Sequence, residues 1–279
     1  HRDLHLSIRR QRQMCIRDSS STFLALDNTT IAVTISEAVY NTDGGSGSLD
    51  TSDFALSISG GTATMSRAAP TSISSSGNVY TLGIGLSGTP DGSEVLTVVP
   101  IDDGVYDGAG NEASTTQSNN TVTLNDQTAP TVSSVTATTA DGSYKVGDVI
   151  AITVTFSETV TVTGTPQLTL ETGSSDAIVD YASSSGATLT FNYTVAAGEN
   201  SSDLDYKNTS ALALNSGTIK DAAGNAATRT LASPAAANSL GANKALIIDT
   251  TVPTISVSYT HLRAHETLRY LVCRLLLEK

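Results

Sequence analysis

The amino-acid sequence predicts an all-β fold of two consecutive β-sandwiches, and three observations support this prediction. Short runs alternate apolar with small or polar residues, as strands with one buried face do. Segments rich in turn formers, such as NTDGGSGS, SGTPDGS, SSSGN and AAGENSSD, separate these runs. The chain also repeats itself internally, and no stretch sustains the periodicity of a capped helix.

Each predicted strand is an alternating run bounded by turn formers. In chain order these runs are 30–36, 54–59, 79–86, 95–99, 121–124, 150–156, 167–171, 177–182, 187–195 and 245–249. Strands this short, separated by frequent turns, are typical of a sandwich. The antibody pattern of Cys, Trp and Cys is absent, so we expect a core of Val, Ile, Leu and Ala with a few Phe and Tyr.

The internal repeat consists of three markers in the same order in both halves. The matching pairs are IAVTISEAV with ITVTFSETV, YDGAGNEA with KDAAGNAA, and NDQTAPTVSSV with IDTTVPTISV, at 31–39 and 152–160, 106–113 and 220–227, and 125–135 and 248–257. The offsets are 121, 114 and 123 residues, so the halves differ only in loop lengths. We therefore expect a first domain at 20–126, a linker at 127–131, a second domain at 132–250 and, at 251–255, a linker that starts a truncated third repeat.

The two ends of the chain differ in composition from everything between them. Back-translation of 257–261 and 13–18 gives two strings that are largely reverse complements, and the words resemble translated sequencing-adapter read-through. We therefore interpret 1–19 and about 256–279 as adapter-derived and exclude them from fold reasoning, as for a fragment of metagenomic origin. The remaining core, 20–255, has 6 Lys+Arg against 23 Asp+Glu, a formal charge of −17.

The core composition excludes several classes of function. All four His and both Cys lie in the excluded ends, so the core has no imidazole or thiol for a catalytic relay or a zinc site. The pair His261 and His265, at helical spacing, follows from adapter codons and is not expected to bind zinc. The strong negative charge disfavours nucleic acid, and the apolar run after His265 is too short for membrane insertion.

Several longer segments carry a family resemblance. ITVTFSETV, TPQLTLETGS, LTFNYTVAAGENSSDLDY, LNSGTIKDAAGNAA and DTTVPT resemble the bacterial Ig-like repeats of large repetitive surface proteins and adhesins. The first half, with SDFALSISGG and SGTPDGSEVLTVVP, resembles a sister repeat type of the same proteins. The resemblance implies two Ig-like, Greek-key sandwiches stacked end to end in an extracellular stalk.

Two groups of residues are candidates for a calcium site. In the D-x-A-G-N segments, Asp107 with Asn111 and Asp221 with Asn225 either offer oxygen ligands or form a tight turn, and the turn is the simpler interpretation. In the Pro-containing linkers, Asp126 and Asp249 either share calcium with a neighbouring domain, as related adhesin stalks do, or are solvated. Any metal must be a hard one bound by oxygen, so calcium is the one cofactor we expect.

A Ser-Glu pair recurs at the same place in both repeats. Ser36-Glu37 and Ser157-Glu158 stand where strand alternation breaks, and we interpret both glutamates as solvated strand ends rather than catalytic carboxylates.

Taken together, these observations predict a non-catalytic spacer of an exported bacterial surface protein or adhesin, located outside the cell. Its partners are then neighbouring Ig-like repeats of the parent chain. The alternative is a module that binds polysaccharide or another cell-surface ligand, which the lack of Trp in the chain disfavours. An enzyme is not expected, because the core offers only carboxylates and hydroxyls.

Overall fold

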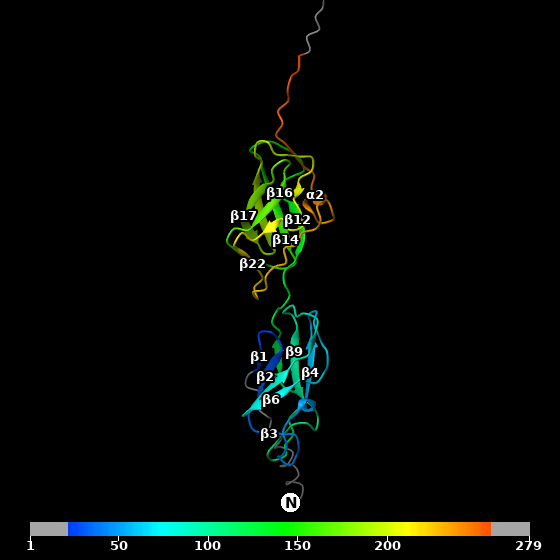
Figure 1. Ribbon diagram of the computed structural model, residues 1–279. Coiled ribbons are helices and arrows are strands. Elements are labelled where there is room, and N and C mark those ends of the chain that lie inside the picture. Colours follow the sequence, from blue (N-terminus) through cyan, green and yellow to red (C-terminus); the bar gives the residue numbers. More distant parts are fainter. Residues whose placement is uncertain (1–21, 258–279) are drawn as a thin grey trace, which may run out of the picture.

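The computed structural model describes residues 22–257, which form two β-sandwiches placed end to end (Figure 1). Segment 126–131 joins the C-terminal end of the first sandwich to the second (Figure 1). The chain enters each sandwich at one pole and leaves it at the opposite pole. The interpretation of 1–19 and about 256–279 as adapter-derived concerns segments that, except for residues 256 and 257, lie outside the described residues.

The first sandwich packs two antiparallel sheets against each other. One sheet has the order β1 (Thr22–Leu24), β2 (Thr30–Thr34), β7 (Val79–Gly83), β6 (Ile73–Ser76), and the other β11 (Thr121–Thr123), β9 (Val95–Pro100), β4 (Phe54–Ser59). Alternate residues of both sheets point inward, and Ile31, Leu82 and Leu96 are fully buried between them. Two short pairs complete the domain, β3 (Val39–Tyr40) with β10 (Tyr106–Asp107) and β5 (Thr64–Met65) with β8 (Leu86–Ser87), together with a 3-10 turn at Thr51–Asp53.

The second sandwich is larger, and its main sheet follows a single continuous path. The order is β12 (Val132–Ala137), β14 (Val149–Phe156), β18 (Thr188–Thr194), β17 (Ala177–Ser185), β16 (Gln167–Glu171), β20 (Asp205–Tyr206), with β21 (Leu212–Ala213) also on β16. The core between its faces includes the fully buried Ile152, Phe191, Leu170 and Tyr206. Three smaller groups remain: β13 (Gly142–Tyr144), β23 (Leu246–Asp249) and β19 (Asn200–Ser201) in one sheet, β15 (Thr161–Thr163) with β22 (Thr218–Lys220), and the short helix α2 (Leu240–Asn243) beside β12.

Strand β17 connects the two faces of this sandwich. Its first residues pair with β16 and its last residues pair with β18, and the register shifts between Tyr181 and Ser183. A shift of this kind bends the strand and increases its twist, which lets one strand take part in both faces. The sandwich therefore closes along β17 without a break in the ladder.

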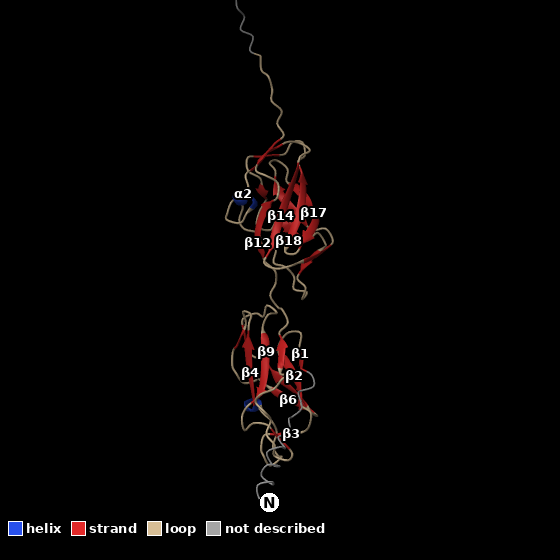
Figure 2. Cartoon of the chain, turned by 180° about the vertical axis from the view of Figure 1, so that it is seen from behind, coloured by secondary structure: helices blue, strands red, loops and turns tan. Residues whose placement is uncertain are grey.

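The all-β prediction is confirmed, since strands dominate both units (Figure 2). The alternation gave the bounds of β4 and β16 as observed, and β2, β9, β14 and β18 to within two residues. The predicted run 79–86 is divided, because β7 ends at Gly83 and β8 pairs elsewhere with β5. No helix within 22–257 is long and apolar enough to cross a membrane.

Candidate junction site

The linker 126–131 is hydrogen-bonded to the first sandwich on one side. The backbone N–H of Gln127 and the hydroxyl of Thr128 both donate to the carbonyl oxygen of Pro90, at 2.9 and 3.0 Å. The side-chain amide of Gln127 donates to the carbonyl of Leu26 at 2.8 Å. Gly92 has a φ of +80°, and a Cβ there would lie 3.1 Å from the Cβ of Asp126. The loop around Pro90 is therefore packed closely against the start of the linker.

The same linker is hydrogen-bonded to the second sandwich on its other side. Thr131 exchanges two bonds with Ser157, donating to its hydroxyl at 3.0 Å and accepting from its backbone N–H at 2.8 Å. The N–H of Thr228 donates to the carbonyl of Pro130 at 2.8 Å. The side-chain amide of Asn225 reaches furthest along the linker, to the carbonyls of Asp126 at 3.2 Å and Thr128 at 3.4 Å. Asn225 thus contacts backbone that also contacts the first sandwich.

The D-x-A-G-N segments form the same turn in both sandwiches, as the turn interpretation predicts. Oδ1 of Asp221 accepts from the backbone N–H of Asn225, and its Oδ2 from the Asn225 amide, each at 2.8 Å. Asp107 accepts the same two bonds from Asn111 at 2.8 and 2.7 Å. Each turn adds an N–H donor on the Asp Oδ1, and each is followed by an isolated antiparallel bridge. Both aspartates are buried by this arrangement.

Three carboxylates meet where the linker enters the second sandwich, and we call Asp126, Glu158 and Asp221 the junction cluster. One oxygen from each lies within 4.8 Å of the others, with Asp221 buried and the other two half-buried. Burial, then the charges of Asp126, Asp221 and Asp91, raise the pKa of Glu158 above its usual value. Asp91 belongs to the loop of the first sandwich that holds the linker, so both domains contribute negative charge here.

The donor set of the junction cluster suits a hard divalent cation. Carboxylate oxygens from separate segments are the ligands that calcium takes in proteins, and the absence of imidazole and thiol from the cluster removes the preference for zinc or copper. Of the ion pairs between described residues, none includes a cluster carboxylate. Repulsion between the three groups is therefore not relieved by a basic side chain in the described part of the chain.

The structure brings together some of the predicted ligands and separates others. Asp126 and Asp221 meet in the junction cluster, and Asn225 lies beside them as a hydrogen-bond donor. Asp107 and Asn111 stand at the opposite pole of the first sandwich, where β10 pairs with β3 (Figure 1). Asp249 ends β23 at the far pole of the second sandwich, and its Oδ1 accepts from the N–H of Thr251 at 2.9 Å. Asp126 forms the same local bond to Thr128, at 2.8 Å.

Sequence reasoning missed Glu158 as a member of the junction cluster and Asp91 as a nearby charge. Glu158 is half-buried beside two other carboxylates rather than fully solvated at a strand end. The available signal was the recurrence of Ser-Glu at one place in both repeats, with Ser157 now seen to hold the linker. For Asp91 no repeated pattern marked the loop, and only the tertiary structure places its charge near the cluster.

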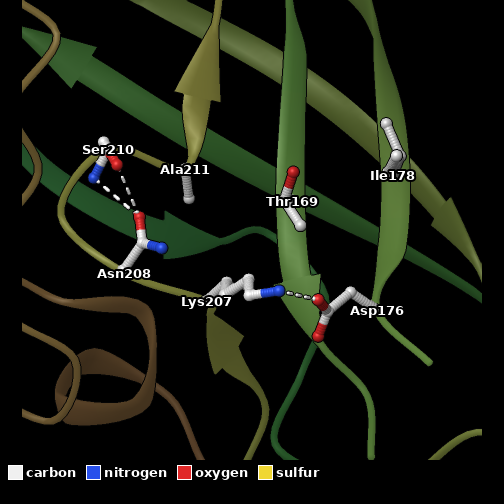
Figure 3. A pocket seen from close by; sticks show the side chains of 7 residues that line it. All are labelled: Thr169, Asp176, Ile178, Lys207, Asn208, Ser210 and Ala211. Carbon is white, nitrogen blue, oxygen red and sulfur yellow. Dashed lines mark hydrogen bonds and ion pairs between the residues drawn. The ribbon is translucent and has the colours of Figure 1, made fainter. Parts of the chain in front are cut away.

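A second concave feature, a hollow, lies on the second sandwich (Figure 3). Seven residues line it: Thr169, Asp176, Ile178, Lys207, Asn208, Ser210 and Ala211. Lys207 and Asp176 form an ion pair across it, and Asn208 Oδ1 accepts from the N–H and hydroxyl of Ser210. No aromatic ring lines the hollow, so it lacks the stacking surface that a sugar-binding face usually offers.

The comparisons with known proteins agree with this architecture. No curated protein matches the chain. The matched family region begins at Asp126 of the junction cluster and covers most of the second sandwich, ending before α2 and β23. Residues 126–236 match the family of the bacterial Ig-like domain, which identifies the sandwich fold as Ig-like.

Proposed function

We propose that the two sandwiches are non-catalytic spacer modules of a large exported bacterial surface protein or adhesin, holding a distal functional domain away from the cell. Bacterial Ig-like domains are typical of surface and extracellular proteins, which supports this setting. The observation that carries the proposal is the hydrogen bonding of the linker, because the linker is bonded to the first sandwich on one side and to the second sandwich on the other. A spacer holds a distal domain at a fixed distance only when the joints between its modules resist bending.

The geometry of the joint supports a stiff connection rather than a tether. Asp126, Gln127, Thr128, Pro130 and Thr131 each take part in a hydrogen bond. Pro130 is buried and fixes its own φ, which removes backbone freedom from the middle of the joint. A flexible linker, by contrast, is rich in Gly and Ser and leaves its backbone solvated. The linker joins one pole of the first sandwich to the facing pole of the second, so the two sandwiches lie end to end (Figure 2).

Calcium at the junction cluster is the second part of the proposal. Asp126, Glu158 and Asp221 would supply carboxylate oxygens. The ion would offset both the burial and the neighbouring negative charges that raise the pKa of Glu158. Because Asp126 belongs to the linker and the other two to the second sandwich, the ion would tie the linker to that sandwich. This would add stiffness to a joint that hydrogen bonds already hold.

Residual dipolar couplings measured on the full chain test the spacer. We expect one alignment tensor to fit residues 22–125 and 132–249 together, because a stiff joint makes the sandwiches tumble as one body. Separate tensors with different magnitudes would show a flexible tether and overturn the spacer.

Thermal melts in millimolar calcium and in excess chelator test the metal. Tight binding to the folded state should raise the midpoint of the second sandwich by several degrees. The double variant Asp126→Asn and Glu158→Gln should remove that rise, while Asp249→Asn is the matched control and should keep it. Coinciding melts of the unmodified chain would exclude calcium and leave a plain spacer.

A further inference from the structure

The turn that holds the linker in the second sandwich has an equivalent at the outer pole of the first. Asp107 and Asn111 repeat the bonds of Asp221 and Asn225 to within 0.1 Å. Ala113 donates to the carbonyl of Val105 at 2.8 Å, as Ala227 does to Ile219 at 2.9 Å. The asparagine is therefore held by its aspartate in the same way in both domains, although the additional N–H donor to the aspartate Oδ1 is Ala109 in the first turn and Gly224 in the second.

The strands beside this turn also correspond. Val39 is buried and begins β3, as the buried Val160 precedes β15, and each strand pairs with the one that leads into its D-x-A-G-N turn. Glu37 and Glu158 are both half-buried, each following an exposed serine. The outer pole of the first sandwich thus presents Glu37 and Asn111 at the positions of Glu158 and Asn225. It differs in one respect, because the backbone of Asp43 packs on Gly110, whereas nothing packs on the equivalent Gly224.

Strand register then identifies which positions would carry a linker at the outer pole. β1 pairs with β2 as β12 pairs with β14, so that Thr22 opposite Val33 corresponds to Val135 opposite Val154. Counting back along the sequence from these residues, Gln13 aligns with Asp126 and Arg17 with Pro130. The sequence ahead of β1 therefore lacks the Asp-x-x-x-Pro pattern that both 126–130 and 249–253 show.

We propose that the outer pole of the first sandwich is a docking site for an extended Asp-x-x-x-Pro segment entering ahead of β1, with the Asn111 amide donating to its backbone carbonyls. The expected occupant has the chemistry of 126–131 and of 249–254, both present in this chain. Its aspartate caps its own turn, as Asp126 and Asp249 do, and presents the carbonyls in extended backbone. The inference rests on the proposed spacer, for which it names the contact between successive repeats.

The test restores this segment in the full chain. Residues 13–18 are replaced by the six-residue sequence of 126–131, and the control carries the same six residues in scrambled order. Thermal unfolding is followed by NMR signals of buried residues, Leu82 and Leu96 for the first sandwich and Leu170 and Leu189 for the second. The second sandwich then serves as an internal reference that the replacement should not change.

The restored segment should raise the midpoint of the first sandwich by about 4–8 °C over the scrambled control, the shift that about one net hydrogen bond gives in a domain of this size. Asn111→Ala is then made both in the chain with the 126–131 sequence and in the scrambled control, which gives a double-mutant cycle. The loss of the Asn111 bond to Asp107 is common to both and cancels. The rise should become clearly smaller in the Asn111→Ala background, where only contacts equivalent to those of Ser157 and Thr228 remain. An equal rise with and without the Asn111 amide would overturn the proposal, as would no rise at all.

Failure here is distinguishable from failure of the spacer. The alignment tensors of the existing joint at 126–131 do not depend on residues 13–18 or on Asn111. Matching tensors with no effect of the restored segment would refute the docking site and leave the spacer standing. Divergent tensors would refute the spacer whatever the melts show.

Discussion

Replacing Asn225 separates the turn it closes from the linker it holds. Asn225→Ala removes the bond to Asp221 Oδ2 at 2.8 Å and the two longer bonds to the carbonyls of Asp126 and Thr128. Asn111→Ala removes the equivalent bond to Asp107 at 2.7 Å in the first sandwich, where no linker of this pattern precedes β1. The two variants therefore share one loss and differ in the contacts to the linker.

The magnitudes follow from the geometry of these bonds. A hydrogen bond to a carboxylate contributes about 1.5–3 kcal/mol to the free energy of unfolding, and we expect this loss in both variants. The two linker bonds, at 3.2 and 3.4 Å, are longer than the usual optimum and together should contribute about 1 kcal/mol. Asn225→Ala should therefore destabilise its sandwich by about 1 kcal/mol more than Asn111→Ala destabilises the other.

Two measurements on the full chain check this difference. Urea unfolding followed by NMR signals of each core gives the free energy of unfolding of each sandwich, and residual dipolar couplings report the joint. Asn225→Ala should make the two alignment tensors diverge, whereas Asn111→Ala should leave them matched. Equal losses of stability together with matched tensors in both variants would refute the reasoning, because Asn225 would then stabilise only its own turn.

Three further predictions concern buried or paired charges outside the junction cluster. Glu94 is fully buried and accepts hydrogen bonds from the backbone N–H groups of Thr62, Ala63 and Asp91. Glu94→Ala should therefore lower the free energy of unfolding in urea by about 3 kcal/mol, and Glu94→Gln by clearly less. Equal losses in the two variants would contradict this. Burial raises the pKa of Asp53 above its ordinary 3.8, so folding disfavours the ionised carboxylate. The contribution of Asp53 to the free energy of unfolding therefore falls as the pH rises through the window just above 3.8. Asp53→Asn should remove that decline in melts between pH 3 and 7, and an unchanged pH profile would refute the assignment. Lys207→Ala breaks a half-exposed ion pair with Asp176 and should cost less than about 1 kcal/mol, so a loss of 2 kcal/mol or more would show that the pair is worth more than its exposure suggests.

The sequence by itself determined the strands whose one face is buried along their whole length. In β4 and β16 each second residue is apolar, and the observed bounds agree with the alternation. The two-residue strands β3 and β10 left no such signal, because a pair that short is defined only by its partner across the sandwich. Strand β12 was missed because the register shift between Val132 and Ser134 interrupts the alternation, which leaves only Val135 and Ala137 as buried residues two apart.

The candidate site divides in the same way. The turns at Asp107 and Asp221 could be predicted from D-x-A-G-N, because an aspartate that caps its own turn needs only its neighbours in sequence. The meeting of Asp126, Glu158 and Asp221 could not, since these residues come from a linker and from two loops that follow different strands. A turn depends only on residues adjacent in sequence, so it can be predicted locally. Residues from separate loops meet at one pole of a sandwich only after the strands have paired, and the tertiary structure alone decides that pairing.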